Sequence, residues 1–330
     1  MRIHPECPAI LARGLTKDFP GVRAVDRVDL QVNPGEVFGV LGPNGAGKTT
    51  MLRMLATLES ITSGTAEIFG VDAARDPQQA RHFIGVTGQF AAVDNGLTAR
   101  ENLSLFGRLH GLPRREVRQV STQLLEEFSL ADSAHRKVAE FSGGMRRRLD
   151  LAVSLISSPP LIFLDEPTTG LDPRTRNQMW STVRGLVEGG RTVMLTTQYL
   201  EEADQLADRI AVIDRGRLVA VGTPRELKAR VGGYRLRLEL TERSGTEAVV
   251  NELQRIIPRS QIHTDPGEIS CPLSHPGEAA GILSALYRQG TALESVTVSE
   301  PSLDEVFFAL TGHDAPSEQS STRDSQEVGV

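Results

Sequence analysis

Short runs of apolar residues with no polar face recur over the first two thirds of the chain. Such runs are typical of strands buried on both faces of a parallel sheet. They lie at residues 37–41, 161–164, 192–196 and 209–213. Apolar residues at helical spacing separate them; Met51, Leu55 and Leu58, at i, i+4 and i+7, mark a helix from about residue 49 to 58. This alternation predicts an α/β domain with a predominantly parallel sheet.

The stretch between about residues 89 and 140 is mainly helical in pattern, with 99–110 and 114–128 as its clearest helices. After about residue 230 the pattern changes, because residues 234–240 alternate strictly between apolar and polar types. Further elements are predicted at 247–257 (helix), 261–263 and 268–271 (strands), 277–288 (helix) and 293–299 (strand). The order βαββαβ predicts a small ferredoxin-like α+β domain.

A last helix is predicted at 302–310, and residues 313–330 contain almost no apolar side chains, which predicts a disordered tail. We therefore expect an α/β domain over residues 9–230, the α+β domain over 231–312 and the tail over 313–330.

Composition limits the function. A net charge of −6 argues against nucleic acid as a partner. The two cysteines, Cys7 and Cys271, are far apart, which favours a reducing cytosol over a disulfide framework. No stretch approaches the roughly 20 apolar residues that span a bilayer. A role at a membrane would require docking on something else.

A complete phosphate-binding loop follows the first buried strand. It matches the pattern G-x-x-x-x-G-K-[ST] and comprises Gly42, Pro43, Asn44, Gly45, Ala46, Gly47, Lys48, Thr49 and Thr50. Its backbone N–H groups would wrap the phosphates of ATP, Lys48 would neutralise them, and the Thr49 hydroxyl would bind Mg²⁺. A chance glycine-rich turn is the alternative, but the strand before and the helix after the loop argue against it.

Two adjacent carboxylates end the strand at 161–164. Asp165 can reach Mg²⁺, and Glu166 is placed to polarise the attacking water. The alternative is an acidic helix cap. Pro167 and the phosphate loop upstream favour the catalytic role.

A second phosphate-facing element lies upstream of these carboxylates, where Ser142, Gly143 and Gly144 open a helix. A helix N-terminus and a hydroxyl can together grip a phosphate. The chain has one such element and one phosphate loop, so ATP held from both sides requires two chains. The adjacent Arg146, Arg147 and Arg148 span most of a helix circumference, which favours a solvated surface with one partner contact over a phosphate- or lipid-binding patch.

With these motifs in order across residues 9–230, the chain resembles an ATP-binding-cassette ATPase. The resemblance implies that Ser142, Gly143 and Gly144 bind the partner subunit's ATP, although Met145 stands where the family usually has glutamine. It also implies roles for three further residues. Gln89 would sense Mg²⁺ and the membrane partner, Asp172 would couple the two ATP sites, and Phe19 would stack on adenine unless it is a core residue.

One position departs from that family. Gln198 stands where a histidine usually contacts the γ-phosphate. An amide can form the hydrogen bond but carries no positive charge. With Lys48, Asp165 and Glu166 present, we expect Gln198 to be a working γ-phosphate contact.

A transporter subunit is favoured over a soluble cassette ATPase. DNA-repair members carry a long coiled coil, ribosome-associated members carry two cassettes, and neither feature is found here. The finer resemblance is to ATP-binding subunits of daunorubicin/doxorubicin resistance exporters of actinobacteria, which share Gln198 and the C-terminal segment 302–312.

That resemblance implies a homodimer on the cytoplasmic face of the cell membrane, bound to a separately encoded permease that contacts the exported drug. Export of another lipid or a polyketide remains an alternative. The C-terminal domain would regulate or stabilise assembly, or would be a passive appendage.

Overall fold

The structure is a computed structural model that describes residues 7–88, 93–231, 233–241, 246–255, 257–259, 262–265 and 267–312. Gln89 and the predicted tail at 313–330 lie outside these residues. The chain divides after Pro224 into two compact units.

The first unit is built on a six-stranded sheet of order β10-β9-β3-β8-β7-β6. Its strands are β3 (Val37–Leu41), β6 (Ile84–Thr87), β7 (Leu161–Asp165), β8 (Thr192–Thr197), β9 (Arg209–Asp214) and β10 (Arg217–Gly222). All neighbours pair in parallel except β10, an antiparallel edge strand. The four predicted strands are confirmed, each to within one residue.

A second, antiparallel sheet of order β2-β1-β4-β5 was not predicted. It comprises β1 (Ile10–Phe19), β2 (Val22–Val32), β4 (Ser63–Ile68) and β5 (Val71–Asp72). Its pairing shifts register several times between β1 and β2, near Gly14 and Arg27, both of which adopt positive φ. Such bulges interrupt the two-residue period, and the strand signal in the sequence is lost with it.

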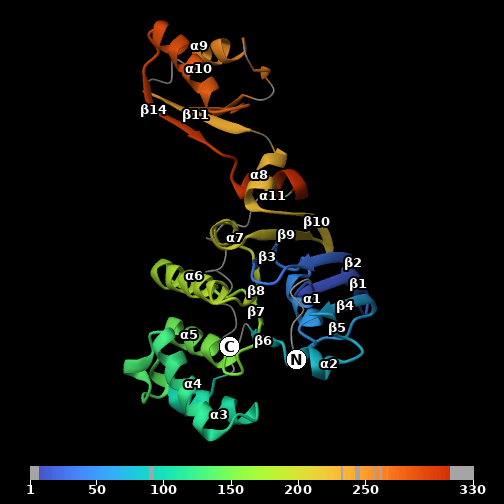
Figure 1. Ribbon diagram of the computed structural model, residues 1–330. Helices are drawn as coiled ribbons and strands as arrows, with labels where there is room; N and C mark the ends of the chain where they lie inside the picture. The colour runs from blue at the N-terminus through green and yellow to red at the C-terminus, as the bar shows by residue number, and fades with distance from the viewer. Residues whose placement is uncertain are drawn as a thin grey trace, which may run out of the picture. The chain divides into compact units, whose positions relative to one another are not determined.

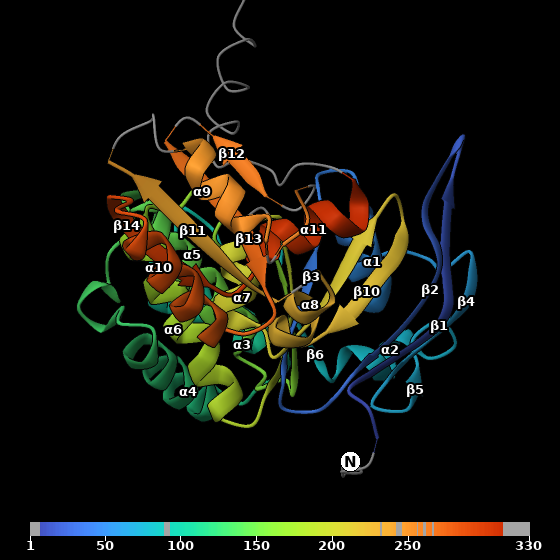
Figure 2. The ribbon, with the colours of Figure 1, turned by 90° about the horizontal axis from the view of Figure 1, so that it is seen from above.

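The helices of the first unit are α1 (Lys48–Leu55), α2 (Pro77–Arg81), α3 (Ala99–Leu109), α4 (Arg114–Glu127), α5 (Gly143–Ser154), α6 (Pro173–Glu188) and α7 (Leu200–Leu206). A further helix, α8 (Pro224–Val231), begins at the division between the units. Figures 1 and 2 show α4 and α5 on the opposite side of the parallel sheet from the antiparallel sheet.

The parallel sheet separates two hydrophobic cores, because its strands alternate their side chains between the two faces. In β7, Phe163 enters the core shared with α1 and the antiparallel sheet, whereas Ile162 and Leu164 enter the core shared with α5 and α6. In β8, Met194 lies on the first side and Val193 on the second. Burial on both faces explains why apolar and polar residues do not alternate along these strands.

The second unit is a four-stranded antiparallel sheet of order β12-β13-β11-β14 with two helices between its strands. Its elements are β11 (Tyr234–Leu240), α9 (Thr246–Leu253), β12 (His263–Asp265), β13 (Glu268–Leu273), α10 (Gly277–Arg288), β14 (Leu293–Ser299) and α11 (Leu303–Thr311). This order and the antiparallel pairing of every neighbour confirm the ferredoxin-like βαββαβ prediction. Leu236, Leu238 and Leu240 supply the apolar face of its central strand β11.

Among the described residues, no helix is both long enough and apolar enough to cross a bilayer.

Candidate functional site

The loop between β3 and α1 wraps a cavity of about 460 Å³. Gly47, which precedes α1, has φ 101°, and a Cβ atom there would lie 2.3 Å from the carbonyl oxygen of Ala24 on β2. Only glycine permits both the left-handed backbone and this close approach. The antiparallel sheet thus presses on the loop and helps to shape the cavity.

Lys48 is the buried cation of this cavity, with 4% of its side chain exposed. Its Nζ donates to the carbonyl oxygens of Gly42 (2.8 Å) and Pro43 (3.1 Å) and lies 3.7 Å from Glu166 Oε1. Burial lowers the pKa of Lys48, and the nearby carboxylates of Glu166 and Asp165 oppose that shift. The ammonium is therefore held at the loop by oxygen acceptors, as expected for a phosphate-binding lysine.

Asp165 meets two threonine hydroxyls at the carboxyl end of the parallel sheet. Thr196 Oγ1 donates to Asp165 Oδ1 at 2.6 Å, and Thr49 Oγ1 donates to the same oxygen at 3.0 Å. Parallel pairing of β7 with β8 places Asp165 opposite Thr196. Hard oxygen ligands from one carboxylate and one hydroxyl suit Mg²⁺, which takes its other ligands from phosphates and water.

Glu166 has the strained backbone that functional residues often show. Its φ is 47°, and its N–H donates to both the carbonyl oxygen (3.2 Å) and the hydroxyl oxygen (3.1 Å) of Thr196. Its carboxylate accepts from Thr169 Oγ1 at 3.2 Å and lines the loop cavity. The helix-cap alternative is wrong for this residue, because the following helix α6 begins only at Pro173.

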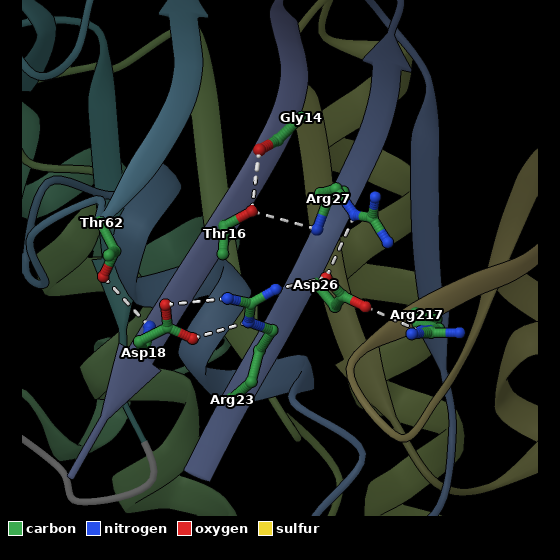
Figure 3. Close-up of polar contacts among 8 residues, drawn as sticks. All are labelled: Gly14, Thr16, Asp18, Arg23, Asp26, Arg27, Thr62 and Arg217. Carbon is green, nitrogen blue, oxygen red and sulfur yellow. Dashed lines mark hydrogen bonds and ion pairs between the residues drawn. The ribbon is translucent and has the colours of Figure 1, made fainter. Parts of the chain in front are cut away.

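The wall of the cavity facing the loop includes Arg23, Arg215 and Gly216, which the sequence did not single out. Figure 3 shows how Arg23 is held: it donates to both Asp18 oxygens (2.7 and 3.2 Å) and to Asp26 at 3.1 Å. Arg217, on β10, donates to the other Asp26 oxygen at 2.8 Å.

Asp26 thereby joins the β1–β2 hairpin to the β9–β10 turn. Burial raises the pKa of Asp26, but the hydrogen bonds from Arg23 and Arg217 outweigh it and hold the pKa below its ordinary value. No local motif reveals the whole network, because Arg217 joins it from a strand 191 residues beyond Asp26.

The Ser-Gly-Gly element caps α5 and does not line the loop cavity of its own chain. Ser142 is the N-cap, accepting from the backbone N–H of Met145 at 3.3 Å, and both Ser142 and Gly143 are exposed. A Cβ atom on Gly144 would lie 2.4 Å from Thr175 Cγ2, so α5 begins against α6. Thr175 in turn donates to Asp172, the N-cap of α6.

Asp172 is therefore fixed in place. Its carboxylate accepts from the Thr175 hydroxyl at 2.7 Å and from the Thr175 N–H at 3.0 Å. The hydroxyl bond is the largest cause of its lowered pKa.

The predicted solvated surface at Arg146, Arg147 and Arg148 is wrong for Arg147. Only 13% of its side chain is exposed. Its guanidinium donates to the backbone carbonyl oxygens of Gly88 (2.6 Å), Asp165 (3.0 Å), Pro167 (3.1 Å) and Glu166 (3.4 Å). We call this arrangement the Arg147 clamp; it ties the helix behind the Ser-Gly-Gly element to the carboxylate strand and to the residue before Gln89.

Arg148 also points into the protein and donates to the carbonyl oxygen of Phe128 at 2.9 Å.

The structure says less about three other residues that the sequence predicts to contact ATP or Mg²⁺. Gln89 itself lies outside the described residues. Gln198 is half-buried just after β8, two residues beyond Thr196. Phe19 is 41% exposed, which excludes the core alternative; its ring lies 4.9 Å from the Lys17 ammonium and it is not among the residues lining the cavity.

Comparison with known sequences gives matches over nearly the whole chain. A family model described as "ABC transporter" matches residues 25–169, and one described as "ATP-binding protein DrrA1-3-like, C-terminal domain" matches residues 222–311. The daunorubicin/doxorubicin resistance ATP-binding protein DrrA of Streptomyces peucetius is 50% identical, over 97% of this chain and 96% of that protein. Nod factor export ATP-binding protein I of Cupriavidus metallidurans is 39% identical, over 92% of this chain and 97% of that protein.

Among solved structures, a dimeric ATP-binding cassette in a post-hydrolysis state with ADP and phosphate aligns with a TM-score of 0.59 at 26% identity. The alignment covers 65% of this chain and 98% of that one.

Proposed function

The chain belongs to the ABC transporter family of ATPases, which couple ATP hydrolysis to transport, and we propose that it energises export of a hydrophobic antibiotic of the anthracycline class. The observation that carries the ATPase role is the convergence of Lys48 and Glu166 at the loop cavity, with Asp165 hydrogen-bonded to Thr49 of the same loop. The likeness to a daunorubicin/doxorubicin resistance protein supports the substrate class. A relative named for Nod factor export makes another exported substrate the alternative.

The phosphates of ATP would lie on the loop from Gly42 to Thr50, with the Lys48 ammonium exchanging its carbonyl acceptors for phosphate oxygens. Thr49 and Asp165, already 3.0 Å apart, would hold Mg²⁺, with Gln89 as a further ligand. Bound Mg²⁺ would offset the negative charge that develops on the transferred phosphoryl group. Phe19 would stack on the adenine.

Glu166 would orient and polarise the attacking water. Its carboxylate lines the cavity, where the Thr169 hydroxyl and the Lys48 ammonium fix its two oxygens. Gln198 would donate its amide N–H to the γ-phosphate, because it follows β8, the strand beside β7, after which Glu166 comes.

Two copies of the chain would close over two ATP molecules. Ser142, Gly143 and Gly144 are absent from the lining of their own chain's cavity, which supports their serving the partner subunit's nucleotide. The exposed start of α5 offers N–H groups to that phosphate. Asp172, at the start of α6 beside it, would couple the two sites.

The chain would act at the cytoplasmic face of the cell membrane, on a separately encoded permease that contacts the drug. Residues 9–230 would form the ATPase domain and residues 231–312 a domain that regulates or stabilises assembly. The segment around Gln89 would transmit closure to the permease.

The test is drug accumulation in cells that express the chain together with its proposed permease. The wild-type pair should lower intracellular daunorubicin, and Glu166→Gln should abolish that effect while still binding ATP and accumulating as a dimer. Equal accumulation with the wild-type and Glu166→Gln chains, given intact permease, would rule out anthracycline export. A Glu166→Gln chain that stays monomeric with ATP would contradict the two-chain mechanism.

A further inference from the structure

A strongly basic groove lies between α3 and α4, separate from the nucleotide cavity. It is a hollow of about 650 Å³, larger than the cavity of the phosphate loop. Its polar lining is dominated by arginines and hydroxyls: Arg100, Arg108, Arg114, Arg118, Ser104 and Thr122. We call this the arginine groove. Its lining, within the part of the chain that the structure describes, contains no carboxylate.

Helix geometry explains how the sequence builds the groove. Arg100, Ser104 and Arg108 recur at i, i+4 and i+8 on α3, so they share one helix face. Arg114, Arg118 and Thr122 have the same spacing on α4.

The two helices approach closely beneath these rows. A Cβ atom on Gly107 of α3 would lie 2.9 Å from Val117 of α4. The two polar faces therefore line a common groove.

The arginines of the groove lack counter-charges. Among the described residues, none of the four forms an ion pair with a carboxylate. Arg100 donates to Thr122 Oγ1 at 3.1 Å, but its buried Nε has no hydrogen-bond partner. Guanidinium groups crowded together repel one another, and a bound anion would reverse that repulsion. This concentration of positive charge occurs in a chain whose net charge is −6.

Exposed leucines border the groove on α3. Leu105 is 40% exposed and Leu109 is 71% exposed. Each follows a groove residue by one position, which places it about 100° around the helix from the arginine row. A helix face with arginines beside exposed leucines has the character of a segment that lies at a membrane interface.

We propose that the arginine groove binds the phosphate groups of an anionic phospholipid surface, with Leu105 and Leu109 entering the headgroup region. Arginine supplies five N–H donors and no acceptor, and phosphate oxygens match its planar fork. Basic pockets between transmembrane helices bind anionic lipid headgroups, and the arginine groove offers the same donors at the surface of the protein. The flanking leucines favour a lipid over an acidic protein segment, since an anionic protein would not require them.

This inference goes beyond the proposed function and does not depend on the nucleotide site, so either can fail without the other.

The experiment is co-sedimentation of the full-length chain with lipid vesicles. Vesicles of phosphatidylcholine alone should leave the chain in the supernatant, and vesicles containing phosphatidylglycerol should sediment it. Binding should weaken as salt is raised, because exposed charges are screened. Binding that is equal for both vesicle types would overturn the proposal.

A matched pair of double variants tests the groove itself. Arg108→Gln with Arg118→Gln should weaken binding to phosphatidylglycerol vesicles by about thirty-fold, since each basic residue near an anionic surface contributes about a factor of five. Arg115→Gln with Arg288→Gln removes the same charge from exposed positions outside the groove and should bind nearly as wild type. Circular dichroism and ATPase activity establish that both variants fold. Equal losses in the two variants would show nonspecific charge attraction and refute the proposal.

Two further measurements distinguish a lipid surface from free phosphate and from an acidic protein segment. Inorganic phosphate, at an ionic strength matched with chloride, should release no more protein from vesicles than chloride does; selective release by phosphate would assign the groove to the free anion. If the groove variant keeps its vesicle binding but no longer co-purifies with the permease, an acidic protein segment is the occupant and the lipid proposal is wrong.

Discussion

Replacing Arg147 by methionine should destabilise the protein and slow hydrolysis together. The methionine keeps an unbranched apolar stem but removes every donor of the Arg147 clamp. Four backbone carbonyls on two segments then lose a hydrogen bond, at distances from 2.6 to 3.4 Å.

The expected loss follows from those bonds. A hydrogen bond from a charged donor contributes about 1.5–3 kcal/mol, and the longest of the four, to the Glu166 carbonyl, contributes little. Removing the guanidinium also removes its own cost of burial, the cause of its lowered pKa. We therefore expect the free energy of unfolding to fall by about 2–4 kcal/mol, which is roughly 4–16 °C in melting temperature for a domain of this size.

The kinetic effect follows from where the carbonyls lie. Two of them belong to Asp165 and Glu166, so without the clamp the strained Glu166 backbone loses a restraint. A displacement of about 1 Å at a catalytic group can lower the rate about 100-fold. We expect kcat to fall about 10- to 100-fold with a smaller change in KM.

The assays are urea denaturation and ATPase kinetics on matched variants. Arg146→Met is the control, since its neighbouring guanidinium makes one long bond, 3.4 Å, to the Val138 carbonyl. Arg147→Lys keeps the positive charge but not the planar guanidinium, and it should recover part of the unfolding free energy that Arg147→Met loses. If Arg147→Met and Arg146→Met match in stability and kcat, the clamp has no role in the site.

Three other substitutions test the site and its supports. Thr196→Val removes the 2.6 Å bond to Asp165, so stability should fall by about 1.5–3 kcal/mol and half-maximal ATPase activity should need more Mg²⁺, as measured by metal titration. Gly144→Ala places a Cβ atom 2.4 Å from Thr175 Cγ2, so thermal stability should fall by about 1–3 kcal/mol and ATP-dependent dimerisation should weaken. Burial raises the pKa of Glu202 above its ordinary value of 4.5, so the folded state holds that proton more tightly and wild-type stability falls as pH rises above 4.5. Glu202→Gln should lose this part of the decline when urea denaturation is compared at about pH 5 and about pH 8.

Each of these has a matched comparison. Gly143→Ala should keep the wild-type thermal stability, because no atom beyond its chain neighbours and its own helix backbone lies within 4 Å of its Cβ position. Thr175→Ser should restore the stability of a Gly144→Ala chain by removing the colliding methyl group. Thr182→Val removes a hydroxyl on α6 that bonds only its own helix, and it should not change the Mg²⁺ requirement. If the free energy of unfolding of wild type and of Glu202→Gln falls equally between these two pH values, the raised pKa of Glu202 does not cause the decline.

The hydrophobic pattern of the sequence did not predict the antiparallel sheet. Its strands β1 and β2 are long, yet their bulges break the alternation on which a sequence-based prediction depends. Strands β3, β7, β8 and β9 pair in parallel without bulges and are largely buried on both faces, so short apolar runs sufficed to predict them.

The sequence by itself determined the phosphate loop, the Asp165–Glu166 pair, the Ser-Gly-Gly element and the order of the ferredoxin-like unit. Each is a contiguous pattern, and its chemistry follows from neighbouring residues. Only the tertiary structure decided which carbonyls Arg147 holds, 59 residues away at Gly88, and that Asp26 pairs with Arg217, 191 residues away. Such contacts depend on how separate strands and helices pack, and residue spacing along the chain carries no record of that packing.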